Sequence, residues 1–219
     1  FELTIGVDRD DIEDDNLGLY APMFQMLGQS VGTFPDELVF GILKAGFSSL
    51  CYDGQNFFDT DHPVVNEAGA TVSVANTDGG SGAPWFLLCT TGPLKPVILQ
   101  KRKEWEFVAK DDTRDDNVFM RKKYVYGVDG RMNVGYGFWQ QAWGSKQTLN
   151  AANYAAARAA ILSMKGDGGV PLGLVPNLLV VPPSLEGAAR KIVASQLVNG
   201  GETNEWAGTA EVLMTPWLA

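Results

Sequence analysis

The chain has 219 residues and a net charge of −9, with 45% hydrophobic and 20% charged residues. A chain of this length can bury roughly 70% of its unfolded surface, so it can form one large domain or two lobes. The acidic balance argues against an extended nucleic-acid-binding surface, which needs clustered Lys and Arg. No apolar run approaches the ~18–20 residues of a membrane span, so we expect no membrane protein.

The two cysteines, Cys51 and Cys89, are too few for a secreted disulfide scaffold and lack the spacing of a metal site. We interpret them as two reduced, partly buried thiols. Such thiols are typical of a protein that assembles in a reducing cytoplasm.

Residues 1–7 alternate apolar and polar side chains, which predicts a strand with one buried face. Because the chain starts with Phe1 and this strand is already under way, we expect a fragment or a processed product of a longer polypeptide. An acidic run follows the strand and precedes a helical pattern, where carboxylates cap free amides and oppose the helix dipole. This run comprises Asp8, Asp10, Asp11, Glu13, Asp14 and Asp15.

Apolar residues at helical spacing between residues 20 and 47 predict one long helix or two nearly collinear helices. Pro35 lacks an amide hydrogen, so it either kinks this element or occupies the first turn of a second helix with Thr33 near its cap. Residues 53–82 are rich in loop formers, with a turn at Asp53-Gly54.

Five short apolar or aromatic runs then predict an antiparallel sheet: residues 85–88, 97–100, 104–108, 124–128 and 134–138. After a candidate boundary at residues 144–148, the pattern changes. Helices are expected at 153–164 and 184–197, and strands at 178–181 and 210–214. A compact α/β lobe therefore follows a lobe of helix and sheet.

The segment from Cys51 to Pro63 contains the only histidine and suggests catalysis at first sight. Asp59 or Asp61 could orient His62 as a general base, with Cys51 as the nucleophile of a hydrolase or transferase. The same residues also suit a structural loop in which Asp61 caps a turn and Pro63 fixes its exit. We favour the structural loop.

Three other features have a functional and a structural interpretation. The acidic run could hold a divalent cation, but it lacks calcium-loop spacing, and we favour a solvated helix entrance or a charged contact between subunits. The glycine loops at 79–82 and 166–173 lack the order of a phosphate-binding loop. Aromatic residues within 136–143 could stack sugars, as in a carbohydrate-binding adhesin, although such aromatics usually pack a core or an interface.

Three segments, taken together and in order, carry a resemblance to a known family: residues 8–29, 51–63 and 134–143. They resemble the major head (capsid) subunit of Mu-like phages and prophages. The resemblance implies an α+β tailed-phage capsid fold of the Hong Kong 97 type, with a long spine helix, an antiparallel sheet and an α/β axial lobe.

On that template, residues 1–15 supply the returning strand of an extended loop and the acidic run. Residues 16–147 form the peripheral-type domain, whose spine helix covers 17–47, and residues 148–219 form the axial-type domain. Because the strand-rich block precedes the helix-strand-helix block, we expect a permuted connection between the two.

The resemblance also implies a shell-building subunit that is not an enzyme and has neither cofactor nor metal. Copies are expected to form hexameric and pentameric capsomers and an icosahedral shell that encloses phage DNA without sequence-specific binding. Scaffold, portal and decoration proteins are possible partners, with assembly in the host cytoplasm and residence in the virion. The predicted subunit-contact residues are Asp10, Asp11, Asp14, Gly166, Asp167, Gly168 and Gly169.

Overall fold

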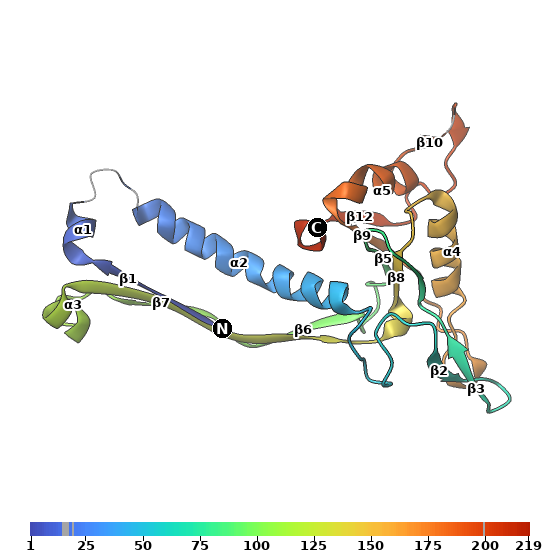
Figure 1. The fold of residues 1–219 in the computed structure, drawn as a ribbon, viewed down its shortest axis with the longest axis horizontal. Coiled ribbons are helices and arrows are strands. Elements are labelled where there is room, and N and C mark those ends of the chain that lie inside the picture. Colours follow the sequence, from blue (N-terminus) through green and yellow to red (C-terminus); the bar gives the residue numbers. More distant parts are fainter. Residues whose placement is uncertain (15–17, 19, 199) are drawn as a thin grey trace. The chain divides into compact units, whose positions relative to one another are not determined.

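The computed structural model describes residues 1–14, 18, 20–198 and 200–219, and it divides into two compact units (Figure 1). The first unit comprises Phe1–Leu38 and Leu99–Val134, and the second comprises Val39–Ile98 and Gly135–Ala219. These limits differ from the expected boundary between residues 147 and 148. None of the described helices is long and apolar enough to cross a membrane.

A three-stranded sheet with the order β1-β7-β6 forms the framework of the first unit. Its strands are β1 (Glu2–Asp8), β6 (Val97–Lys110) and β7 (Lys123–Tyr136). β1 pairs antiparallel with β7, from Glu2 opposite Asp129 to Asp8 opposite Lys123, which confirms the strand expected at residues 1–7. β6 joins the predicted runs 97–100 and 104–108, and β7 joins 124–128 with most of 134–138. The charged residues between the runs do not interrupt a strand, because side chains that point to solvent can be charged.

The helix α2 (Tyr20–Ala45) confirms the long helix expected from the apolar spacing, and the expected start at Leu17 lies outside the described residues. Pro35 lies inside this one helix. The Thr33 hydroxyl donates to the Gln29 carbonyl at 3.2 Å within the helix, so the alternative of a second helix capped near Thr33 is wrong. In the first unit, edge-to-face ring pairs join α2 to the sheet, including Phe24–Tyr126 at 4.7 Å.

The acidic run caps a short separate helix, α1 (Arg9–Glu13). The Asp8 carboxylate accepts a hydrogen bond from the Asp10 amide at 3.1 Å and so caps α1. The sequence predicted that the run would cap the long helix, but α2 has no acidic residue in its first turn. A second short helix, α3 (Asp116–Arg121), links β6 to β7 and ends at Lys122, whose φ of 53° lies in the left-handed region. Asp15 lies outside the described residues.

The second unit contains a mixed five-stranded sheet with the order β12-β9-β5-β8-β4. Its strands are β4 (Thr77–Gly80), β5 (Trp85–Leu88), β8 (Ala142–Lys146), β9 (Leu178–Val181) and β12 (Glu211–Met214). β5 runs antiparallel to β8 and β9, whereas β12 runs parallel to β9. A two-stranded pair, β10 (Leu197–Val198) with β11 (Glu202–Thr203), also belongs to this unit.

One expectation for this region is wrong. Residues 85–88 do not join the other runs in one antiparallel sheet, because all four side chains of β5 are buried and fit only a strand covered on both faces. The sheet of the second unit therefore takes strands from before and after the long β6–β7 hairpin. The expectation that every early strand lies in one peripheral sheet therefore does not hold, because β5 belongs to the mixed sheet. The permuted connection itself stays a prediction.

The two faces of the mixed sheet carry two apolar clusters. On one face, Trp85 and Leu87 pack with residues of α4 (Ala151–Leu162) and α5 (Glu186–Val193). On the other face, Phe86 and Leu88 pack with Phe57 and Phe58 from the loop before β2, with Trp139, and with further apolar side chains. α5 is shorter than the helix expected at residues 184–197, because the 3-10 turn η3 (Pro183–Leu185) precedes it and β10 begins at Leu197.

The remaining elements flank the sheet. A two-stranded hairpin, β2 (His62–Val65) and β3 (Thr71–Val74), pairs His62 opposite Val74. Three more 3-10 turns complete the unit: η1 (Trp139–Gln141), η2 (Asp167–Gly169) and η4 (Pro216–Leu218).

Gly144 tests the packing of the second cluster. A Cβ at this position would meet Phe58 Cγ and Cδ1 at 2.7 Å, so we expect Gly144→Ala to lower the free energy of unfolding by about 1–3 kcal/mol through overpacking. At Gly41, exposed on α2, a Cβ would meet no atom within 4 Å, and Gly41→Ala should instead stabilise by ~0.5–1 kcal/mol. Urea unfolding of both variants measures the change in the free energy of unfolding. If Gly144→Ala were no more destabilising than Gly41→Ala, the close contact between Gly144 and Phe58 would be contradicted.

Candidate functional site

The predicted acidic contact residues lie at the α1 end of the first unit. Asp11 and Asp14 are exposed. Asp10 lies 3.2 Å from the Lys122 ammonium, with about half of its side chain exposed, and 3.7 Å from the guanidinium of Arg9. Exposed pairs of this kind contribute little to stability, so these carboxylates keep most of their charge available to a partner.

The predicted glycine loop lies in the second unit, where it is fastened to the β2–β3 hairpin. The Asp167 carboxylate accepts a hydrogen bond from the Val65 amide at 2.9 Å, and Lys165 lies 3.6 Å from Glu67. Gly169 has a φ of +77°, and a Cβ there would meet Glu67 Cγ at 2.2 Å. The acidic run and this loop therefore belong to different units, and each is a separate candidate surface.

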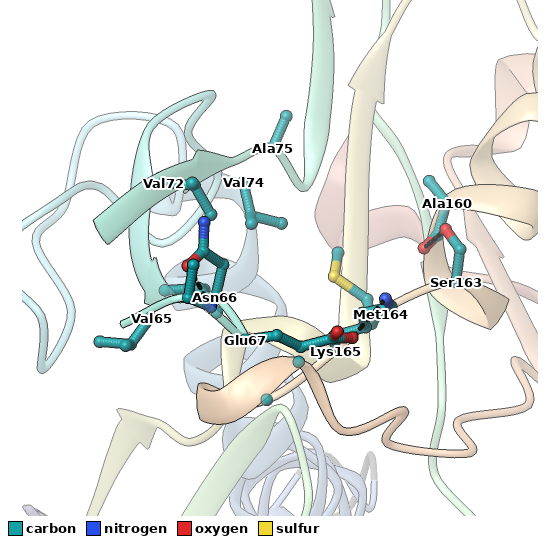
Figure 2. Close-up of a pocket in the computed structure, with 14 residues that line it drawn as sticks. Val65, Asn66, Glu67, Val72, Val74, Ala75, Ala160, Ser163, Met164 and Lys165 are labelled. Atoms are coloured by element: carbon teal, nitrogen blue, oxygen red, sulfur yellow. Dashed lines mark hydrogen bonds and ion pairs between the residues drawn. The ribbon is translucent and has the colours of Figure 1, made fainter. Parts of the chain in front are cut away.

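A hollow of about 500 Å³ lies between the β2–β3 hairpin and the end of α4, beside this loop (Figure 2). Its lining is mainly apolar, and the Glu67–Lys165 pair supplies its charges. Large apolar side chains stay exposed on the following segment, where Val170 is 63% and Val175 is 52% exposed. Neighbouring exposed apolar side chains are typical of a surface that contacts another protein.

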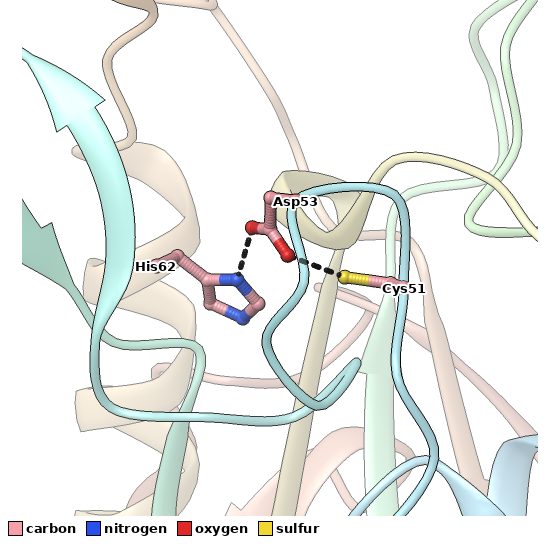
Figure 3. A group of neighbouring side chains, drawn as sticks. All are labelled: Cys51, Asp53 and His62. Atoms are coloured by element: carbon pink, nitrogen blue, oxygen red, sulfur yellow. Dashed lines mark hydrogen bonds and ion pairs between the residues drawn. The ribbon is translucent and has the colours of Figure 1, made fainter.

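The structure brings Cys51, Asp53 and His62 together, as Figure 3 shows. The Cys51 thiol donates to Asp53 Oδ1 at 2.9 Å, and Asp53 Oδ2 lies 2.7 Å from His62 Nδ1. The expected turn at Asp53-Gly54 positions the carboxylate: Gly54 has a φ of +86°, and the Gln55 amide donates to Asp53 Oδ1 at 3.1 Å. β2 positions His62, which is its first residue.

His62 is fully buried, and its ring stacks on Trp139 with centroids 3.9 Å apart. Its Nε2 lies 3.2 Å from Asn76 Oδ1. The Asn76 amide group has a fixed orientation, because its Oδ1 accepts from the Asp59 amide and its Nδ2 donates to the Phe57 carbonyl at 2.8 Å. Nε2 therefore faces an acceptor and carries a hydrogen.

This arrangement differs from the predicted catalytic group. The carboxylate beside His62 belongs to Asp53, whereas Asp59 accepts hydrogen bonds from Asn56. Sequence reasoning missed Asp53 as a partner of His62, because only the turn at Asp53-Gly54 and the start of β2 bring the two residues together. The carboxylate bonds both the thiol and the imidazole, and none of the three residues lines the hollow of Figure 2.

The electrostatics do not favour a nucleophilic thiol. Burial, together with the neighbouring Asp53 carboxylate, raises the pKa of Cys51 to about 11. Burial also acts to raise the pKa of Asp53, but hydrogen bonds from Cys51, His62 and the Gln55 amide outweigh it and leave that pKa below its usual value. The stable state is therefore a protonated thiol beside an ionised carboxylate.

The aromatic residues of the expected stacking platform do not form an exposed row. Trp139 and Trp143 are buried, and the Tyr136 hydroxyl donates to the Ile42 carbonyl at 2.8 Å. Phe138 is partly exposed and contacts Tyr52 edge to face at 5.9 Å. The arrangement supports the alternative of core packing for the two tryptophans.

Comparison with known proteins places the chain among phage head proteins. The family model described as Mu-like prophage major head subunit gpT matches residues 1–218. The major capsid protein of Escherichia phage Mu is 44% identical, over 100% of this chain and 74% of the relative. The Mu-like prophage FluMu major head subunit of Haemophilus influenzae is 46% identical, over 88% of this chain and 65% of the relative.

Solved structures show the same similarity. The subunit in the procapsid of bacteriophage JBD30 is 48% identical, with a TM-score of 0.83 over 99% of this chain and 74% of that one. The subunit in the bacteriophage JBD30 capsid has a TM-score of 0.83 and 34% identity, over 100% of this chain and 74% of that one. Since the family match covers nearly every residue and agrees with these structures, the chain belongs to the Mu-like prophage major head subunit gpT family.

Proposed function

We propose that this major head subunit assembles with copies of itself into the icosahedral shell that encloses the phage DNA. The observation that carries the proposal is its match, over essentially its whole length, to subunits of both a procapsid and a capsid. Its similarity to a tailed-phage capsid protein concerns the entire described fold rather than one motif.

The finer proposal is a fold of the Hong Kong 97 type. The 26-residue helix α2, about 39 Å long at 1.5 Å per residue, would be the spine helix. The β1-β7-β6 sheet would belong to the peripheral domain, and the compact unit with the mixed sheet would be the axial domain. The division into residues 1–15, 16–147 and 148–219 stays a prediction, and the two observed units offer an alternative to it.

The proposed mechanism is repeated weak contact rather than chemistry. Copies arranged as pentamers and hexamers meet at slightly different angles, and charged rims and loops tolerate such differences better than one rigid apolar patch. The exposed carboxylates of α1 and the glycine loop with its exposed apolar neighbours have the properties that such contacts require. We therefore place Asp10, Asp11, Asp14 and residues 166–169 at or near subunit contacts.

Further partners are proposed by analogy. A JBD30 capsid is decorated with minor capsid protein trimers, which supports a decoration protein for this shell. Scaffold and portal proteins are proposed because the chain belongs to a family of phage head subunits. The net charge of −9 suits a wall that encloses DNA without binding it tightly or specifically. The free thiols Cys51 and Cys89 accord with assembly in the host cytoplasm.

We also propose that the chain catalyses no reaction. Its relatives are named as capsid or head proteins. The rival hydrolase or transferase needs an activated thiol, whereas burial keeps the Cys51 thiol protonated.

The acidic contacts can be tested by charge reversal. We expect the combined change Asp10→Lys, Asp11→Lys and Asp14→Lys to reduce shell formation by at least about tenfold, because opposing like charges at each copy of a contact cost on the order of 1–3 kcal/mol. Negative-stain imaging and sedimentation of the assembly reaction measure the yield, and circular dichroism shows whether the fold is intact.

Asp10 also pairs with Lys122 inside the same unit, so a matched control is needed. The double change Asp10→Lys with Lys122→Asp restores that internal pair with its signs exchanged. If this double variant and the triple reversal both assemble normally, the acidic run is not a subunit contact.

The catalytic alternative is tested by the reactivity of Cys51. With a pKa of about 11, only about one thiol in 1,000 is ionised at pH 8, so alkylation by iodoacetamide should be at least ~100-fold slower than that of a small free thiol. Its rate should rise about tenfold per pH unit up to pH 10, as measured by mass spectrometry of the Cys51 peptide. A rate that levels off below pH 8 would show an activated thiolate instead.

A further inference from the structure

We propose that Cys51, Asp53 and His62 form a zinc-binding site that braces the loop of residues 51–61. The proposal is separate from shell assembly and would stand if the predicted subunit contacts proved wrong. It rests on the convergence of three ligand types of different chemistry in one place (Figure 3).

The ligand atoms are close enough for one ion. One ligand atom from each residue lies within 4.8 Å of the other two, and among the described parts of the chain no other three His, Cys, Asp or Glu side chains meet in this way. Zinc binds sulfur at ~2.3 Å and nitrogen or oxygen at ~2.0–2.2 Å, so ligands of a tetrahedral site lie roughly 3.3–3.6 Å apart. Cys51 Sγ lies 2.9 Å from Asp53 Oδ1, and His62 Nδ1 lies 2.7 Å from the other carboxylate oxygen, Oδ2, so small side-chain adjustments would place one oxygen, the sulfur and the nitrogen at these distances.

The imidazole is oriented for this role from outside the cluster. Histidine ligands of metals usually donate their second ring N–H to a fixed acceptor, which sets the tautomer and the ring direction. Asn76 Oδ1 is such an acceptor for His62 Nε2, and its orientation is fixed by the backbone of Asp59 and Phe57. Stacking on Trp139 restrains the ring plane, so Nδ1 remains as the ligand nitrogen that faces Asp53 and Cys51.

A thiolate, an imidazole and a carboxylate together favour zinc over calcium or magnesium, which prefer oxygen ligands alone. Binding exchanges a proton for the ion: the thiol of Cys51 releases its proton to solvent, and His62 would bind the ion through the Nδ1 lone pair while Nε2 keeps its hydrogen. Cys51 is partly exposed, so water can complete a fourth ligand position from that side.

The consequence is structural. Cys51 and Asp53 belong to the loop, whereas His62 begins β2, so one ion would tie the two ends of this loop together. The same loop carries Phe57 and Phe58 into the second apolar cluster. Zinc would therefore stabilise the packing on this face of the mixed sheet.

The test uses the purified full-length subunit, stripped with a chelator and kept reduced. With zinc added at about 100 times the dissociation constant, we expect one zinc per chain after gel filtration and a melting temperature higher by about 5 °C or more. Cobalt in place of zinc should give the intense near-ultraviolet absorption of a thiolate-to-cobalt charge transfer, which requires no variant and identifies sulfur as a ligand.

Two cysteine variants separate this site from unspecific binding. Cys51→Ser, which keeps a hydroxyl to donate to Asp53, should lose the zinc-dependent shift and the cobalt absorption, whereas Cys89→Ala should keep both. The proposal is overturned if the unmodified subunit retains no zinc, if cobalt gives no thiolate absorption, or if Cys51→Ser responds to zinc as strongly as the parent.

Discussion

The burial of β5 on both faces is the constraint on which the second unit depends. Trp85 and Leu87 contribute to the cluster with α4 and α5, and Phe86 and Leu88 contribute to the cluster with Phe57 and Phe58. A strand with four buried side chains cannot leave either face to water, so distant parts of the chain must cover both. This requirement explains why residues 39–98 and 135–219 form one unit, with the long β6–β7 hairpin inserted between them.

The same constraint creates the polar network around His62. The loop that supplies Phe57 and Phe58 also places the half-buried Asp53 and Asp59 beside the fully buried His62 and Asn76. Buried polar groups are costly unless they are hydrogen-bonded. The Asn76 side chain supplies these hydrogen bonds to several groups at once: it accepts from the Asp59 amide, donates to the Phe57 carbonyl and lies within hydrogen-bond distance of His62 Nε2. Removing Asn76 would therefore leave several buried groups without a partner, which is more costly than the loss of one hydrogen bond.

Local sequence patterns predicted the local elements well, because the alternation of β1 and the apolar spacing of α2 each depend on a few neighbouring residues. The placement of β5 depends on pairing with β8 and β9, which lie far away in the chain, although its four consecutive apolar residues were a sign of burial on both faces. The candidate site shows a similar limit. Proximity in sequence suggested Asp59 or Asp61 for His62, but the turn at Asp53 and the β2–β3 hairpin bring Asp53 to the imidazole instead. Spacing rules detect sites whose residues lie on one helix, strand or turn. A site whose residues meet only through tertiary packing has to be found from the folded chain.

Interior and surface of this subunit have different physical requirements. Interactions around His62 are buried, directional and specific to one arrangement, so they suit a subunit that keeps its shape. The pair Asp10–Lys122 is exposed and contributes little within one chain. Contacts that are weak one at a time become effective when many of them form together, as in a shell of repeated subunits. In a self-assembling subunit, strong interactions are therefore expected inside the fold and adjustable ones at its surface.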